Sequence, residues 1–163
     1  SGVKNNFSTL VDGIMATTPT WKDIEFIRKN TKLPLILKGI THPSYAKKAI
    51  EIGIDGIVVS NHGGRVLDTL VTTMDILPKI VEVVDNKIPI LLDGGITRGT
   101  DILKALALGA SAVMIGKPIM YGLATAGALG VAHSLKILKD ELEISMALTG
   151  CKTLRDINKD ILF

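Results

Sequence analysis

The sequence predicts an α/β fold in which parallel strands alternate with helices and together make half of an eight-stranded (β/α)8 barrel. Apolar residues make up 47% of the 163 residues and aromatic residues only 4%, so the apolar content is mainly Ile, Leu, Val and Ala. That mixture suits parallel strands buried on both faces and covered by helices. The apolar runs end near residues 38, 60, 93 and 116, at spacings of about 22 to 33 residues that suit βα units.

The placement of the glycine-rich and charged motifs favours the half barrel over a small open sheet. Each motif comes directly after a predicted strand, at the edge where α/β barrels carry their sites. No GxGxxG turn follows the first strand, although a dinucleotide-binding open sheet would need one there. A half barrel leaves two sheet edges unpaired, so we expect a second half, on another chain or in a further part of the same protein.

The first elements follow a polar segment. Residues 1–20 are mostly polar and lack clear periodicity, so we expect a loop or linker there and the barrel half over residues 21–163. Residues 21–30, with three apolar positions, predict a helix. Residues 35–37 predict a short strand, and the proline before it stands where it removes no hydrogen bond from the sheet.

The middle of the chain predicts two helices around a buried strand. Residues 43–52 should be helical, because a proline stands at the first position and a glycine follows the last one. Residues 56–60 contain the run Ile-Val-Val, which is typical of a buried parallel strand. Residues 72–84 predict a helix that Pro78 can kink.

The last part of the chain repeats the alternation. Residues 88–92 predict a strand that ends at Asp-Gly-Gly, and residues 100–108 predict a helix that ends at a glycine. Residues 112–115 predict a strand that ends at Gly-Lys. A long helix should then run over about residues 124–148, because Gly150 stands where a helix would end.

Composition and charge argue against several classes of partner. The net charge is +3, but acidic residues accompany the lysines and no basic stripe with interleaved aromatic residues is present, so we expect no nucleic-acid partner. The longest apolar stretch, residues 105–116, is interrupted by Gly109 and Ser111 and is shorter than the roughly 20 residues that span a bilayer, so we expect no membrane partner.

The single Cys151 predicts a structural thiol in a reducing compartment, and we expect a cytoplasmic protein. No His, Cys, Asp or Glu cluster has the spacing of metal ligands.

Residues 60–65 (SNHGGR) carry the strongest chemical signal. They follow an apolar run, so they should form a tight turn at the carboxyl end of a buried strand. His62 can move a proton near neutral pH, and Arg65 can bind a carboxylate through two parallel hydrogen bonds. A base beside a carboxylate clamp indicates chemistry at the α-carbon of a carboxylic acid. The alternative is a loop in which the histidine caps a helix and the arginine is solvated.

Two further strand ends predict an anion site. Residues 93–99 (DGGITRG) and 116–118 (GKP) each stand between a strand and a helix. Glycines there expose backbone N–H groups and a helix N-terminus adds positive potential, which suits a phosphate. Arg98 could supply charge. The alternative is a pair of ordinary strand-to-helix turns.

Lys38 stands at the end of the first predicted strand. A lysine at the end of a buried strand is awkward unless it meets an anion. We therefore expect Lys38 to face a cofactor that becomes negatively charged, and the alternative is a solvated lysine.

Five motifs stand in a characteristic order: LKG at 37–39, SNHGGR at 60–65, DGG at 93–95, GTD at 99–101 and GKP at 116–118. Together they resemble the FMN-dependent α-hydroxy-acid oxidases and dehydrogenases, the group that includes glycolate oxidase, lactate oxidase and flavocytochrome b2. The tail MALTGC also resembles the last helix of that family, and the resemblance extends over about residues 20–161. It implies that the chain is the C-terminal half of a TIM (β/α)8 barrel, strands five to eight, with FMN as the cofactor.

The resemblance also implies a role for each matching residue. His62 would be the active-site base, and Arg65 would bind the substrate carboxylate. Lys38 would stabilise the anionic reduced flavin, and Ser60 would contact the flavin. The ribityl and phosphate region of FMN would be held by Asp93, Gly94, Gly95, Gly116 and Lys117.

Two positions depart from the family pattern. The family usually has Arg where this chain has Thr97, and again where it has Lys117, and both positions face the FMN phosphate. Lysine keeps the charge without the bidentate fork of arginine, whereas threonine keeps only a hydroxyl donor. Arg98 would compensate by turning toward the phosphate. We therefore expect FMN phosphate to be held differently or more weakly.

The expected function is the FMN-dependent oxidation of a small L-2-hydroxy acid to the 2-oxo acid, by an oxidase or a dehydrogenase. In the family, the N-terminal half of the barrel carries the tyrosines that hold the substrate and the Asp that orients the histidine, so the 163 residues alone should be incomplete. The alternatives are an inactive half-barrel fragment, one half of a nicked enzyme, or an FMN barrel with a different substrate. The resemblance further implies a homo-oligomer, a tetramer in the family. It also allows a peroxisomal location, although the chain does not end in a Ser-Lys-Leu type of address.

Overall fold

The computed structural model describes residues 13, 14 and 16–162, and the chain divides into two units, Ser1–Leu33 and Pro34–Phe163. In the first unit, helix α2 (Trp21–Asn30) forms where it was predicted. The loop predicted for residues 1–20 is wrong at residues 13, 14, 16 and 17, which are helical. The hydroxyl of Thr17 donates to the carbonyl of Gly13 at 3.0 Å, so a polar side chain here closes a helical turn. Residues 1–12 of that prediction lie outside the described residues.

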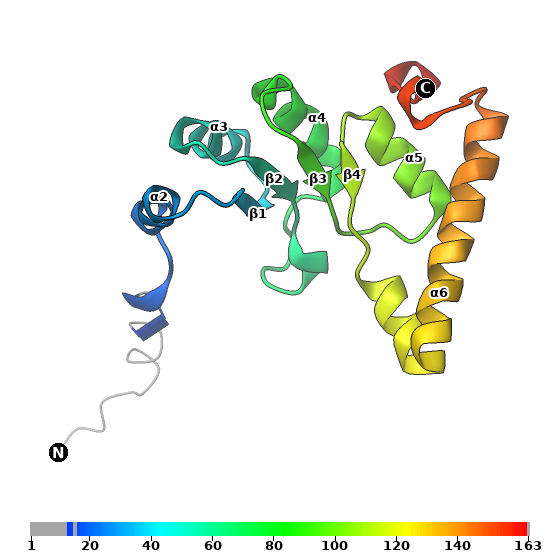
Figure 1. Ribbon diagram of the computed structural model, residues 1–163, viewed down its shortest axis with the longest axis horizontal. Coiled ribbons are helices and arrows are strands. Elements are labelled where there is room, and N and C mark those ends of the chain that lie inside the picture. Colours follow the sequence, from blue (N-terminus) through cyan, green and yellow to red (C-terminus); the bar gives the residue numbers. More distant parts are fainter. Residues whose placement is uncertain (1–12, 15, 163) are drawn as a thin grey trace. The chain divides into compact units, whose positions relative to one another are not determined.

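The second unit is built on a four-stranded parallel sheet in the order β1-β2-β3-β4 (Figure 1). Ile57 in the middle of the sheet lies opposite Leu37 on one side and Ile90 on the other. All residues of β2 are buried, as the apolar run predicted. Neighbouring parallel strands in sequence order confirm the α/β class and its βα units. The strands are β1 (Ile36–Ile40), β2 (Gly56–Val59), β3 (Ile90–Leu92) and β4 (Ala112–Val113).

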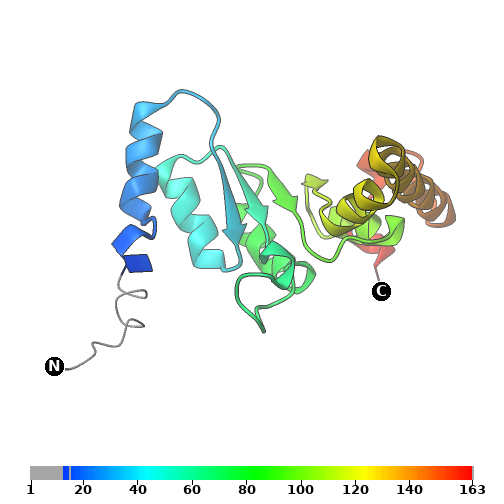
Figure 2. The same ribbon diagram turned by 90° about the horizontal axis from the view of Figure 1, so that it is seen from below.

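Helices connect these strands and pack against the sheet. Helix α3 packs on β1 and on α4, α4 packs on β3, and α5 packs on β4 and α6; Figure 2 shows α3 and α4 side by side. Helix α4 continues through Pro78. The largest fully buried side chains come from β2, β3 and α4: Ile57, Val59, Leu77, Ile80, Val84 and Leu92. The helices are α3 (Pro43–Ile52), α4 (Thr73–Val84), α5 (Gly99–Ala107) and α6 (Lys117–Leu148).

Four predicted boundaries are corrected by the structure. Strand β3 begins at Ile90 rather than at 88. Strand β1 runs on to Ile40, because Gly39 adopts a φ of +95° at an irregularity in the register that lets the strand continue. Strand β4 ends at Val113 rather than at 115. Helix α6 begins at Lys117 rather than near 124, since a proline stands in its first turn, where the missing N–H costs nothing.

Helix α6 is interrupted at Ala126 and Gly127. Gly127 has φ 58° and ψ −140°, a conformation that is essentially restricted to glycine. The interruption brings the backbones of Gly122 and Gly130 so close that a β carbon at either position would overlap the other residue. The first part of α6 therefore folds back on the second, and glycines are required where the two parts meet.

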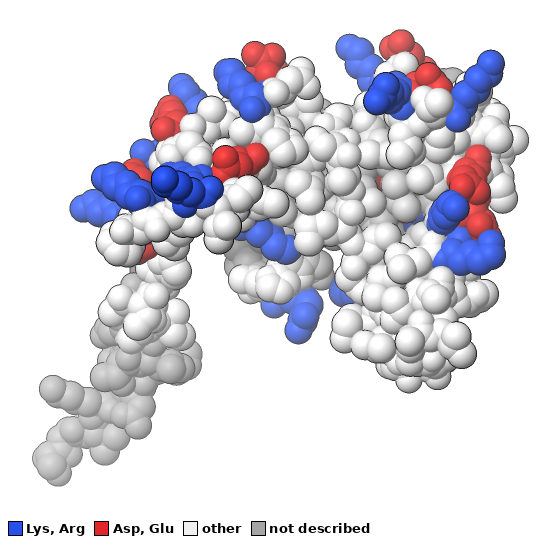
Figure 3. Space-filling model, viewed as in Figure 1, with Lys and Arg blue, Asp and Glu red and all other residues white. Residues whose placement is uncertain are grey.

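The C-terminal segment closes a second, smaller core. Cys151 is buried together with Leu103, Ala107 and Ile157, and its thiol is free, which confirms the structural role predicted for it. No helix among the described residues is both long and apolar enough to cross a bilayer. On the face drawn in Figure 3, Lys and Arg are interspersed with Asp and Glu, and the lobe formed by the first part of α6 carries little charge.

Candidate functional site

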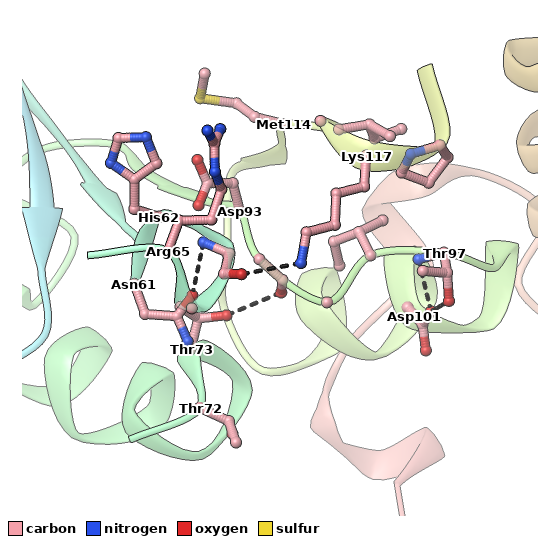
Figure 4. A pocket seen from close by; sticks show the side chains of 18 of the residues that line it. Asn61, His62, Arg65, Thr72, Thr73, Asp93, Thr97, Asp101, Met114 and Lys117 are labelled. Atoms are coloured by element: carbon pink, nitrogen blue, oxygen red, sulfur yellow. Dashed lines mark hydrogen bonds between the residues drawn. The ribbon is translucent and has the colours of Figure 1, made fainter. Parts of the chain in front are cut away.

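A cavity of about 830 Å³ opens at the carboxyl ends of the strands. Its volume is that of a site for a cofactor or a drug-sized ligand. Strand β1 and the turns after β2, β3 and β4 contribute to its wall, and Figure 4 shows residues from those three turns. The lining residues are Lys38 within β1, residues 61–65 and 72–74 after β2, residues 93–97 and Asp101 after β3, and residues 114–118 and Met120 after β4.

His62 lies in a single turn of 3-10 helix, η1 (His62–Gly64), directly after β2. The φ angles of His62, Gly63 and Gly64 are +56°, +66° and +73°. For a histidine this left-handed conformation costs about 1–3 kcal/mol, so other contacts must hold it. The His62 N–H donates to the Ser60 hydroxyl at 3.1 Å, and the Gly63 N–H donates to the Asn61 side chain at 3.1 Å.

The imidazole of His62 and the guanidinium of Arg65 extend to the same side of the cavity (Figure 4). No hydrogen bond joins either side chain to another part of the described chain. Both groups are therefore available to a ligand, one as a proton acceptor and the other as a planar donor fork.

Lys38 lies within β1 rather than at its end, because the strand continues to Ile40, and it contacts the residues that follow β2 and β3. Its Nζ donates to Asp93 Oδ2 at 2.5 Å and to the Ser60 hydroxyl at 2.6 Å. The anion that Lys38 meets within the described residues is thus Asp93. The other carboxylate oxygen of Asp93, Oδ1, is buried and has no hydrogen-bond partner among the described residues. Because such a group is costly to leave unsatisfied, Oδ1 marks a place where a ligand can donate a hydrogen bond.

The N-terminus of α5 differs from the predicted anion site, because carboxylates of the chain already occupy it. The N–H groups of Thr97 and Arg98 donate to Asp101 at 3.0 and 2.9 Å, and the Gly99 N–H donates to Glu141 at 2.8 Å. The Arg98 guanidinium pairs with Glu141 at 3.1 Å and does not line the cavity. The structure therefore does not bring Arg98 inward to replace the charge that Thr97 lacks.

The backbone of two glycines, Gly95 and Gly116, leaves open space in the wall of the cavity. A β carbon built on Gly95 or on Gly116 would meet no atom within 4 Å, and both glycines line the cavity. Lys117 also lines it, and its Nζ donates to the Gly63 carbonyl at 2.9 Å. Open glycine backbone and an ammonium group therefore lie at this end.

Some lining residues were missed from the sequence. The Thr73 hydroxyl donates to the Gly94 carbonyl at 3.0 Å and so holds the glycine turn after β3. Met74, Met114 and Met120 supply apolar wall, and nothing in the sequence pattern pointed to them.

Ser60 lies outside the large cavity and lines a smaller one of about 300 Å³, with Lys38 and His62 lining both. Ser60 is buried, and its hydroxyl contacts Lys38 and the backbone of His62. Its observed role is therefore to hold these two residues. The described residues contain no group of three or more potential metal ligands.

Comparison with known proteins finds relatives of this chain over most of its length. The family model of FMN-dependent dehydrogenases matches residues 2–163. A peroxisomal (S)-2-hydroxyacid oxidase of Arabidopsis thaliana is 55% identical over 141 residues, 86% of this chain and 39% of the relative. An L-lactate oxidase of Nostoc sp. is 52% identical over 143 residues, 88% of this chain and 39% of the relative.

Solved structures of mandelate oxidase share the fold. The structure with 3,3-difluoro-2-hydroxy-3-phenylpropionic acid superposes with a TM-score of 0.83 at 45% identity, over 86% of this chain and 43% of that chain. The parallel α/β architecture thus matches the fold of these oxidases. This chain spans about two fifths of the length of the curated relatives it matches.

Proposed function

Because the chain belongs to the family of FMN-dependent dehydrogenases, we propose that it is the C-terminal half, strands five to eight, of a (β/α)8 enzyme that oxidises a small L-2-hydroxy acid to the 2-oxo acid. The single observation that carries this proposal is the placement of His62 and Arg65 on one side of the cavity at the strand ends. The relatives that match are called 2-hydroxyacid, L-lactate and mandelate oxidases, which agrees with a carboxylate substrate that carries a hydroxyl on the neighbouring carbon.

The cavity residues fit FMN. The unpartnered Asp93 Oδ1 suits the hydroxyls of a ribityl chain, and the open backbone of Gly95 and Gly116 suits a phosphate. Lys117 adds positive charge at that end, and Lys38 would offset negative charge on the reduced ring. Bound FMN supplies an acceptor for the two electrons that leave the substrate.

The residues of this chain bind and orient the acid. Arg65 would grip the substrate carboxylate with two parallel hydrogen bonds, which fixes the distance between the α-carbon and His62. Conversion of the hydroxy acid to the oxo acid releases two electrons and two protons. The His62 imidazole would accept one of these protons, and the other would leave with the two electrons for which bound FMN is the acceptor. No described residue hydrogen-bonds the imidazole, so the group that sets its tautomer would come from the N-terminal half of the barrel.

The test is a turnover assay on glycolate, lactate and mandelate with the full-length protein and two variants. His62→Gln should lower kcat by about 10²–10⁴, the usual contribution of a general base. Arg65→Met should mainly raise KM, and the exposed Lys104→Met serves as the control. A wild-type protein that turns over none of these acids would contradict the proposal, and a His62→Gln variant with the turnover of the wild type would contradict the role of His62.

A second measurement separates an enzyme from an inert half barrel. The mass of the purified material and its visible absorbance report whether a second polypeptide and a flavin accompany the chain. A yellow particle with both halves supports the enzyme, while a colourless chain of 17.4 kDa supports the inert fragment. Size-exclusion chromatography of the yellow particle would test the homo-oligomer that the resemblance implies.

A further inference from the structure

Lys117 supplies a long-range contact to the turn that carries His62. Its Nζ donates to the Gly63 carbonyl at 2.9 Å, across 54 residues of sequence. Its Cε lies 3.5 Å from the position that a β carbon on Gly63 would take, so the lysine stem also packs on the turn. The other side-chain hydrogen bonds to this turn come from Ser60 and Asn61. Among the described residues, Lys117 is therefore the one side chain from outside the loop that hydrogen-bonds the turn.

This contact matters because the turn is strained. Three consecutive residues have positive φ angles, and the first of them is His62. A non-glycine residue in that conformation persists only when its surroundings hold it. Without the link from Lys117, the side-chain hydrogen bonds to the turn would come only from Ser60 and Asn61, its neighbours in sequence.

The same ammonium also faces the open end of the cavity. An ammonium has three N–H donors, and Gly63 accepts from one of them. Lys117 lines the cavity together with Gly95 and Gly116, where the backbone is open. An anion bound there can share the ammonium with the Gly63 carbonyl, and the ammonium would then be fixed from both sides.

We propose that Lys117 is a positioning residue that holds the His62 turn in place and couples it to an anion bound beside Gly95 and Gly116. The identification of that anion with the FMN phosphate rests on the proposed function, whereas the contact between Lys117 and the turn does not. An anion bound beside Gly95 and Gly116 would restrain the turn further. Binding of the cofactor and the orientation of His62 would then be linked through Lys117.

Amide hydrogen exchange tests the first part. Lys117→Met keeps most of the stem and removes the donor, so the Gly63 and Gly64 amides should exchange about fivefold faster, the effect of one lost hydrogen bond. Lys117→Arg should restore the rates to within about twofold because it keeps a donor. Lys104→Met is the control and should leave them unchanged. Wild-type exchange in Lys117→Met would overturn the proposal.

Histidine NMR tests the coupling, with inorganic phosphate as the probe. The Cε1–H signal of His62, assigned with His62→Gln, should shift as phosphate is added to the wild-type chain and should stay unmoved in Lys117→Met. An equal shift in both proteins, or no shift in the wild type, would overturn the coupling. In the full-length enzyme, Lys117→Met should lower kcat more than it raises the KM for the hydroxy acid.

The outcomes separate this inference from the proposed function. Full activity of His62→Gln would remove the proposed role of His62 as the base but leave the exchange experiment intact. The role of Lys117 alone would be removed by a different pair of results. His62→Gln would be inactive, while Lys117→Met would match the wild type in amide exchange, in the phosphate-induced shift of the His62 signal and in turnover.

Discussion

Breaking the ion pair between Lys38 and Asp93 should destabilise the chain more than breaking a surface pair. The atoms Nζ and Oδ2 are 2.5 Å apart, and the two side chains are 44% and 16% exposed. Exposed pairs contribute about 0.2–1 kcal/mol, and breaking a buried pair costs about 3–5 kcal/mol. Because the lysine is nearly half exposed, the buried figure must be discounted for screening by solvent. We expect Lys38→Met to lower the free energy of unfolding by about 2 kcal/mol.

A double-mutant cycle isolates the pair from the other contacts of the two residues. Urea unfolding would be measured for the wild type, Lys38→Met, Asp93→Asn and the double variant, without added FMN. The coupling energy should be about 1 kcal/mol, since the loss of the contact between Lys38 and Ser60 cancels in the cycle. The matched control is the pair Lys136–Asp140, whose side chains are 70% and 46% exposed and for which about 0.3–0.5 kcal/mol is expected.

Equal coupling energies for the two pairs would refute this reasoning. Such a result would mean that solvent screens Lys38 and Asp93 as fully as a pair on the surface of a helix. It would also argue against the interpretation that the buried Asp93 Oδ1 accepts a hydrogen bond from a bound ligand. A larger coupling at Lys38–Asp93 would support a partly desolvated charge pair at the ends of the strands.

Three further changes can be followed by denaturation. Gly99→Ala would place a β carbon into the α6 backbone and should lower the free energy of unfolding by about 1–3 kcal/mol; an unchanged urea midpoint would show that α5 and α6 do not pack this closely. Thr72→Ala removes the cap of α4, whose hydroxyl accepts from the Asp75 N–H at 3.2 Å, and should cost about 1 kcal/mol in urea; an undiminished stability would contradict that cap. Hydrogen bonds from Thr153 lower the pKa of the Asp156 carboxyl below its usual 3.8. The stability from that carboxylate is therefore present above pH 3.8 and is lost as the pH falls through the lowered pKa. The difference in Tm between the wild type and Asp156→Asn should accordingly shrink from pH 7 to pH 2, and a constant difference would contradict the assignment.

Much of the fold could be predicted because its signals are local. Helix α3 has the bounds that a proline at its start and a glycine after its end predicted. The apolar run in β2 predicted a fully buried strand. The predicted start of α6 was wrong by several residues, and the missed part contains Gly122, a residue type that is unfavourable in a helix by propensity. Gly122 is tolerated there because the helix folds back on itself, which is a tertiary contact.

The sequence predicted which motifs form the candidate site, but it did not predict the contacts between their side chains. The sequence by itself determined that His62, Arg65, Asp93 and Lys117 stand at strand ends, because parallel strands bring their carboxyl ends to one edge. Only the tertiary structure decided that Lys38 pairs with Asp93, that Glu141 caps α5 and takes Arg98 away from the cavity, and that Lys117 holds the His62 turn. The physical reason is distance along the chain. The residues in these contacts lie 42 to 55 positions apart in the sequence. Local backbone preferences do not specify which charged side chain from a distant turn will contact a given residue.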